Sequence, residues 1–188
     1  MIDERKLPPA FPTHRHSAEF WEQLGRAIAT YGFLEEVLGK AIFAFTGTRT
    51  YAPEEIATAY EAWVATLERA LIDPLWNLAE SYGKSVREHP DSTITNIDEL
   101  VADIKEAASL RNVLCHGSWH GPNVDGASVP FFVNRRKEIF DSAIDAEYLR
   151  RIQSHVAELS CAVINTVTHM GFQFPGGAGP GKSIWVAP

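Results

Sequence analysis

Residues 111–116 carry side chains that could stabilise negative charge and move a proton. Arg111 holds a positive charge that it cannot lose in a protein, and His116 can accept and release a proton near neutral pH. Asn112 adds an amide that can orient either group through hydrogen bonds. Cleavage at a phosphate ester needs a fixed cation and a proton carrier, so this set predicts phosphoryl-transfer chemistry that requires no metal ion.

Residues 96–117 should form the helix that positions this set. At 3.6 residues per turn, Arg111 falls near the centre of an apolar arc, whereas Asn112 and His116 lie together at its edge. The apolar positions are Ile97, Leu100, Val101, Ile104, Ala107, Ala108, Leu114 and Cys115. We therefore expect Arg111 to point inward. The alternative is structural: Arg111 pairs with a core carboxylate and His116 only caps the helix.

Three further residues are candidates for supporting the site. Glu35 falls at the margin of the apolar stripe of the first predicted helix, from which its carboxylate could meet and orient Arg111. A glutamate exposed at the rim of that stripe is an equally good interpretation. Ser118 and His120 follow the motif helix closely and complete the candidate set.

Hydrophobic periodicity predicts an all-α fold, an up-and-down bundle of four long helices. The helices should cover about residues 16–45, residue 53 to the polar link at 84–95, residues 96–117 and residues 145–170. Asp73-Pro74 should kink or break the second of them, because proline lacks the amide hydrogen and restricts the residue before it.

A small β-hairpin is expected to be inserted before the last helix. Residues 129–133 and 138–140 are rich in valine, isoleucine and phenylalanine, and they flank a turn at 134–136. The predicted organisation is an N-terminal arm at 1–15, a helical bundle at 16–171 and a tail rich in glycine and proline at 172–188. A chain of 188 residues is expected to form one compact unit.

The pattern Arg111-Asn112-x-x-x-His116 lies on the third long helix of an all-helical chain and is followed by Gly117 and Trp119. It resembles the signature of the HEPN superfamily, and the likeness covers the layout of most of the chain. Many HEPN domains are metal-independent endoribonucleases whose two motifs face one cleft in a dimer. The resemblance implies that Arg111 stabilises charge on the scissile phosphate and that His116 moves a proton to or from the ribose hydroxyl or the leaving oxygen. Asn112 would hold the histidine or the phosphate.

The resemblance thus implies a homodimer that cleaves single-stranded RNA by attack of the ribose 2′-hydroxyl and leaves a cyclic phosphate. A non-catalytic HEPN module that binds a nucleotide, RNA or a protein is the alternative. HEPN toxins often carry a tyrosine two residues after the motif histidine, where this chain has Ser118. No antitoxin or other protein regulator can therefore be named, although a role in stress or defence responses is what the resemblance suggests.

The net charge of −7 restricts how RNA could be bound. Nonspecific affinity grows with the number of phosphates neutralised, so an acidic chain needs a local basic cleft. Candidates for its walls are Arg135, Arg136 and Lys137, and further along Arg150 and Arg151. A solvated turn and a solvated helix face explain these charges equally well. Neither DNA nor a membrane is an expected partner.

Residues 176–183 match the phosphate-loop pattern to the letter, yet nucleotide binding there is not expected. A phosphate loop requires a buried strand before it and a helix after it. Here a predicted helix ending at Met170 precedes the loop, and five residues that end in proline follow it. Residues 172–188 should instead form a flexible or docked tail.

Cys115, His116 and His120, with His14 and His16 from the arm, could in principle gather a zinc ion. Their spacing matches no standard zinc pattern, so we expect neither a metal nor a cofactor. The two cysteines of the chain are too few for a disulfide framework. With no apolar segment long enough for a membrane span and no leader-like start, the sequence predicts a cytoplasmic location.

Overall fold

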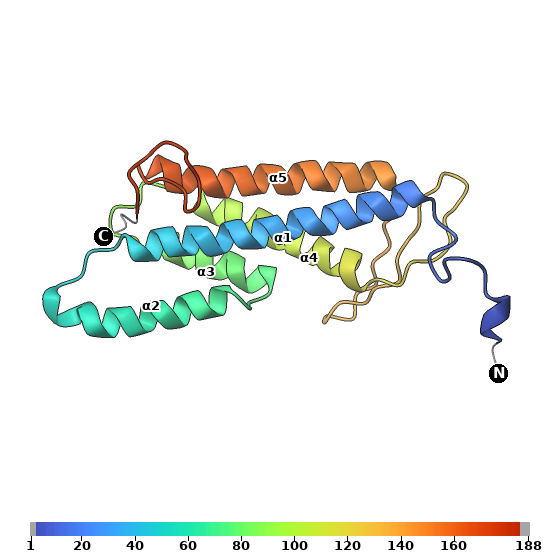
Figure 1. Ribbon diagram of the computed structural model, residues 1–188, viewed down its shortest axis with the longest axis horizontal. Coiled ribbons are helices and arrows are strands. Elements are labelled where there is room, and N and C mark those ends of the chain that lie inside the picture. Colours follow the sequence, from blue (N-terminus) through green and yellow to red (C-terminus); the bar gives the residue numbers. More distant parts are fainter. Residues whose placement is uncertain (1–2, 185–188) are drawn as a thin grey trace. The chain divides into compact units, whose positions relative to one another are not determined.

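The computed structural model describes residues 3–184 and confirms the all-α class. Figure 1 shows the order of the helices, which are α1 (Ala18–Gly47), α2 (Ile56–Ala70), α3 (Leu75–Arg87), α4 (Ile97–His116) and α5 (Ala146–His169), with two short 3₁₀ helices, η1 (Glu4–Lys6) and η2 (Pro53–Glu55). Within residues 3–184, no helix combines the length and the apolar character that crossing a membrane requires.

Residue contacts divide the chain into two compact units. Of the described residues, 3–30 and 110–155 form unit 1, and 31–109 and 156–184 form unit 2. Each of the helices α1, α4 and α5 contributes one end to unit 1 and the other end to unit 2. The motif residues therefore belong to unit 1, whereas Glu35 belongs to unit 2.

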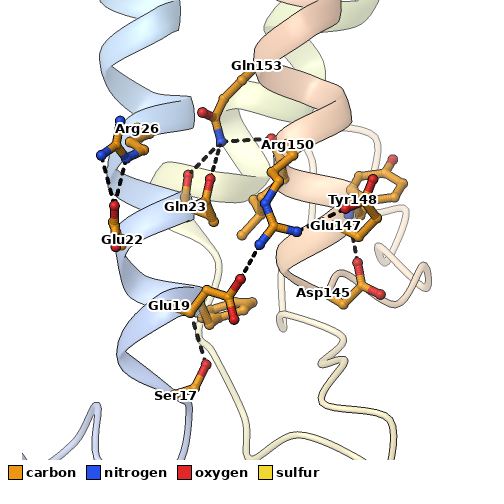
Figure 2. A network of polar contacts seen from close by, with 12 residues as sticks. Ser17, Glu19, Glu22, Gln23, Arg26, Asp145, Glu147, Tyr148, Arg150 and Gln153 are labelled. Atoms are coloured by element: carbon orange, nitrogen blue, oxygen red, sulfur yellow. Dashed lines mark hydrogen bonds and ion pairs between the residues drawn. The ribbon is translucent and has the colours of Figure 1, made fainter.

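Capping side chains fix the two helix starts in unit 1. The Ser17 hydroxyl oxygen accepts a hydrogen bond from the Phe20 amide at 3.1 Å, and the Asp145 carboxylate accepts one from the Tyr148 amide at 2.6 Å. Such caps satisfy amides that have no partner within the helix. Figure 2 shows the two starts, which are joined by Gln153 of α5, whose amide donates to Gln23 of α1 at 3.0 Å.

The chain breaks at Asp73-Pro74, where a kink or a break was expected. Helix α2 ends at Ala70, and Pro74 adopts an extended conformation, with ψ of 152°, immediately before α3. Proline cannot supply the amide hydrogen that would continue α2, and it disfavours helical geometry in the residue before it. Residues 3–184 therefore contain five α-helices where the sequence suggested four long ones.

The β-hairpin predicted for residues 129–140 is wrong, because no strand forms in the described part of the chain. One isolated antiparallel bridge, Val133 to Ile139, joins the two arms of the expected hairpin. These two side chains are 43% and 65% exposed, so the alternating residues have no core to cover. A two-stranded hairpin is marginal unless a hydrophobic face packs against something. One residue of the segment also pairs outside it, through a single bridge from Phe131 to Ser118.

Unit 2 has a large apolar core, in which Tyr82 of α3 is fully buried. The Thr166 hydroxyl donates to the Val163 carbonyl at 2.7 Å, which leaves its oxygen to accept from the Tyr82 hydroxyl at 2.8 Å. Burial raises the pKa of Tyr82 to about 12, because ionisation would place a charge in the core. This hydrogen bond ties α3 to the part of α5 that belongs to unit 2.

Acid should destabilise unit 2 through His89, whose side chain is 4% exposed. Its Nδ1 accepts from the Asp91 amide at 3.2 Å, and its Nε2 lies 3.1 Å from the Thr48 hydroxyl, which itself donates to the Ala44 carbonyl. Only a neutral ring can accept at Nδ1 while donating at Nε2. Burial accordingly lowers the pKa of His89 below its ordinary 6.5, with Asp91 opposing and Arg49 adding to the shift.

The unfolded chain therefore binds a proton that the folded chain excludes as the pH falls through 6.5, so the free energy of unfolding should decrease from about pH 7.5 to about pH 5. Urea denaturation at both pH values measures this difference. In the His89→Gln variant this difference in the free energy of unfolding should become smaller. In His155→Gln, a change at an exposed position on α5, the difference should stay the same. An equal pH dependence in His89→Gln and the unmodified protein would contradict the assignment.

The tail folds back on itself in unit 2. The Gln173 amide donates to the Lys182 carbonyl at 2.9 Å, and the Lys182 amide donates to the Gly171 carbonyl at 2.7 Å. Gly181 has a φ of 113°, and a Cβ there would lie 2.4 Å from the Phe172 backbone, so glycine is required at this crossing. No helix follows the glycine-rich loop up to residue 184, and residues 185–188 lie outside the described part of the chain.

Candidate functional site

The last two turns of α4 present the three motif residues in different environments. Arg111 is half-buried, whereas Asn112 and His116 are exposed. Between them Val113 and Leu114 are 4% and 2% exposed and anchor the turn in the core of unit 1. The helix therefore has the apolar arc that the sequence predicted, with Asn112 and His116 at its solvent edge and Arg111 less deeply buried than the centre of that arc implied.

Gly117 ends α4 at a point where the chain has no room for a side chain. Its amide donates to the Val113 carbonyl at 2.8 Å. A Cβ at this position would lie 2.6 Å from that carbonyl oxygen and 2.8 Å from Cβ of Pro130. After Gly117 the chain pairs Ser118 with Phe131 through two backbone hydrogen bonds of 2.9 and 2.8 Å. The close contact with Pro130 thus fixes the direction in which the chain leaves His116.

Gly117→Ala should lower the free energy of unfolding by about 1–3 kcal/mol, because a backbone carbonyl and a proline ring, neither of them flexible, must move. Urea denaturation checks this value. Gly25→Ala is the matched control, since Gly25 lies on α1 in the same unit and a Cβ there meets nothing within 4 Å. That variant should be neutral or slightly more stable. Equal stabilities for the two variants would show that the Pro130 segment yields freely.

The N-terminal arm packs against residues 118–121, the post-motif segment that follows Gly117. The Trp119 ring lies edge-on to Phe20, with ring centroids 5.1 Å apart, and edge-on to His16 at 6.4 Å. Nε2 of His16 lies 2.8 Å from the carbonyl oxygen of His120, which also accepts from the Ser128 hydroxyl at 2.9 Å. The indole of Trp21 donates to the Thr13 carbonyl at 2.8 Å. The arm and the post-motif segment are therefore held together within unit 1.

A cavity of about 340 Å³ lies between the arm and this segment in unit 1. Prolines of the arm line it, together with Phe11, His14, Arg15, Trp119, His120 and Gly121. Sequence reasoning gave the arm no role in the site and missed Phe11 and Arg15. The signal available in the sequence was the cluster His14-Arg15-His16 three residues after the aromatic Phe11.

The expected basic residues divide into two kinds. Arg135, Arg136 and Lys137 are exposed on a turn that the Asn134 side chain closes, accepting from the amides of residues 136 and 138 at 2.9 and 3.0 Å. Arg150 instead contacts two carboxylates in Figure 2. Its hydrogen bond with Glu147 and the charge of Glu19 raise its pKa. Arg151 lies over the Tyr148 ring at 5.4 Å.

Because two carboxylates offset the charge of Arg150, this side chain has less to offer a phosphate than the open turn at 135–137. The turn itself needs a left-handed residue, and Lys137 takes that conformation with a φ of 64°. The described contacts bring neither group next to the motif. Ser118 and His120 are both exposed and follow the motif helix in unit 1, and their supporting role stays a prediction.

Glu35 lies in unit 2, where it is half-buried and lines a cavity of about 560 Å³. Its neighbour Glu36 is exposed and pairs with Lys40 at 2.6 Å at the edge of the same cavity. The expected contact between Glu35 and Arg111 stays a prediction. Among residues 3–184, no three histidine, cysteine, aspartate or glutamate side chains gather as metal ligands would.

The candidate site thus consists of the exposed His116 and Asn112 and the half-buried Arg111. The same unit contains the cavity lined by aromatic and basic residues. No profile of a known protein family matches the chain, and searches of curated proteins and of solved structures gave no match either.

Proposed function

We propose that this chain is a HEPN-like domain, an up-and-down helical bundle that pairs as a homodimer and cleaves single-stranded RNA in the cytoplasm. The observation that carries the proposal is the end of α4, where Asn112 and His116 are exposed beside the half-buried Arg111. Side chains that must meet a substrate need exposure, and a charge-stabilising arginine gains from partial shielding from water.

In the proposed reaction, His116 takes the proton of a ribose 2′-hydroxyl, whose oxygen attacks the adjacent phosphorus. The bond from phosphorus to the 5′-oxygen then breaks, and His116 of the second copy returns a proton to that oxygen. Arg111 stabilises the negative charge that builds on the phosphoryl oxygens, and Asn112 holds the imidazole or the phosphate. The products are a 2′,3′-cyclic phosphate and a free 5′-hydroxyl, and no metal takes part.

The test is to incubate the purified protein with a varied set of single-stranded RNAs in the presence of EDTA. Cleavage should proceed and leave cyclic phosphate ends, which mass spectrometry of the fragments identifies. The same sequences with 2′-O-methyl groups should remain intact, because the attacking hydroxyl is blocked. Cleavage that EDTA abolishes would overturn the metal-free mechanism, and the absence of cleavage with every RNA would favour a non-catalytic binding module.

Dimerisation is tested separately by sedimentation equilibrium. A composite cleft needs two copies, so the proposed enzyme should sediment as a dimer at concentrations at which it is active. A strict monomer that still cleaves RNA would remove the second histidine from the reaction and would require the leaving oxygen to be protonated by another group, such as His120 or water.

A further inference from the structure

The cavity between the arm and the post-motif segment is lined by aromatic and basic residues, although the chain as a whole is acidic. The whole protein carries 24 acidic and 17 basic residues, yet none of the described residues that line this cavity is acidic. Its walls hold Arg15, two histidines, Phe11 and Trp119. A ligand that is flat, aromatic and attached to a negative charge fits these walls, because rings stack and arginine pairs with phosphate.

The aromatic walls of the cavity are an exposed Phe11 and a half-buried Trp119. Phe11 is 55% exposed, and its ring stacks on that of His14 with centroids 5.7 Å apart and an interplanar angle of 29°. Trp119 is held edge-on by the buried Phe20, so its orientation is fixed before any ligand arrives. Pre-oriented rings bind at a low entropic cost, since little freedom remains to be lost.

Arg15 lies close to the floor of the cavity. A Cβ built on Gly121 would be 3.0 Å from Cδ of Arg15 and 3.2 Å from one of its guanidinium nitrogens. The guanidinium therefore crosses directly over the Gly121 backbone, where a larger side chain would displace it. The volume of about 340 Å³ is near the lower end of the range typical of small-molecule pockets, so one nucleotide fits and a duplex does not.

We infer that this cavity is a subsite for one unpaired RNA base. The base stacks against Phe11 and Trp119, and Arg15 contacts the neighbouring phosphate. Trp119 follows His116 by three residues in the same unit, so a base held here belongs to a nucleotide close to the bond that is cut. The inference deepens the proposed ribonuclease function and rests on it for its substrate class. Within that substrate class a single strand supplies the base, because duplex bases stay stacked and paired.

The experiment measures binding apart from cleavage. Fluorescence anisotropy follows a short fluorescein-labelled 2′-O-methyl RNA, which cannot be cut, as protein is added. Phe11→Ala should weaken binding by about 5- to 150-fold, the usual effect of losing one base stacked on an aromatic ring. Phe11→Tyr should bind like the unmodified protein, whereas Phe11→Leu, which keeps an apolar side chain without a ring face, should resemble Phe11→Ala.

Phe33→Ala is the matched control, since Phe33 is 50% exposed and lies in unit 2. It should leave binding unchanged. Annealing the RNA to its complement should abolish the difference between Phe11→Ala and the unmodified protein. Wild-type affinity in Phe11→Ala, or wild-type affinity in Phe11→Leu, would overturn the stacking subsite.

The two hypotheses fail in distinguishable ways. If the unmodified protein cleaves RNA with cyclic ends and Phe11→Ala binds and cleaves equally well, the ribonuclease stands and the subsite falls. If no RNA is cleaved but the uncleavable RNA binds in a manner that depends on Phe11, the subsite stands and the enzyme falls.

Discussion

His116→Ala should slow the cleavage of single-stranded RNA by about 10²- to 10⁴-fold, the range expected when a positioned acid or base is removed. The reason is that an alanine methyl group cannot exchange protons, so the 2′-hydroxyl would have to lose its proton to water. His116 is exposed and is the last residue of α4, so its removal leaves no hole in the core. Single-turnover cleavage measures the loss, and thermal unfolding should give an unchanged midpoint.

His155→Ala is the matched control, because His155 is also an exposed histidine on a helix and also belongs to unit 1. It should cleave RNA at the rate of the unmodified protein. His116→Ala with undiminished activity would exclude the histidine from proton transfer. An unfolded His116→Ala protein would instead assign it the structural role of a helix cap.

The helices were predictable because their signals are local. Helix α4 runs from Ile97 to His116, close to the expected 96–117, and α5 begins directly after Asp145, whose side chain caps it. Each of these boundaries depends on residues within one turn of the helix end. The break at Pro74 is equally local, since proline acts on its own residue and on the one before it.

The hairpin prediction was wrong because its signal, unlike that of the helices, depends on residues outside the segment. Alternating β-branched and aromatic residues favour a strand, but a stable strand also needs a partner strand and an apolar surface to pack against. Within the segment Val133 and Ile139 form only a single bridge, and Phe131 pairs outside it, with Ser118. The pattern of residues 129–140 alone does not identify Ser118 as a partner.

The cavity could not be predicted either, because it depends on contacts between residues that are far apart in the sequence. The hydrogen bond from His16 to the His120 carbonyl joins residues 104 positions apart. Periodicity within a single segment carries no information on such a contact. The prolines of the arm indicated an extended segment and no more, although the arm supplies five of the eight residues that line the cavity.

Arg111→Ala should reduce cleavage by about 10²- to 10³-fold, the effect typical of removing one group that stabilises charge in the transition state. It should also lower the free energy of unfolding by about 1–3 kcal/mol, because Arg111 is half-buried and its removal strands any polar partner. Arg111→Lys keeps the charge but loses the planar fork of donors that matches a phosphate. It should therefore recover part of the stability and little of the activity.

Arg26→Ala is the control for Arg111, since Arg26 is an exposed arginine of unit 1 that pairs with Glu22 on the same helix. It should alter neither cleavage nor the free energy of unfolding by much. Full activity in Arg111→Lys would show that a point charge suffices and would weaken the case for bidentate contact with the phosphate. An Arg111→Ala protein with undiminished stability would contradict the inward orientation, because a side chain that points into solvent can be removed without cost. Loss of stability with undiminished cleavage would assign Arg111 a structural role only. Another cation would then have to stabilise the charge on the phosphate during cleavage.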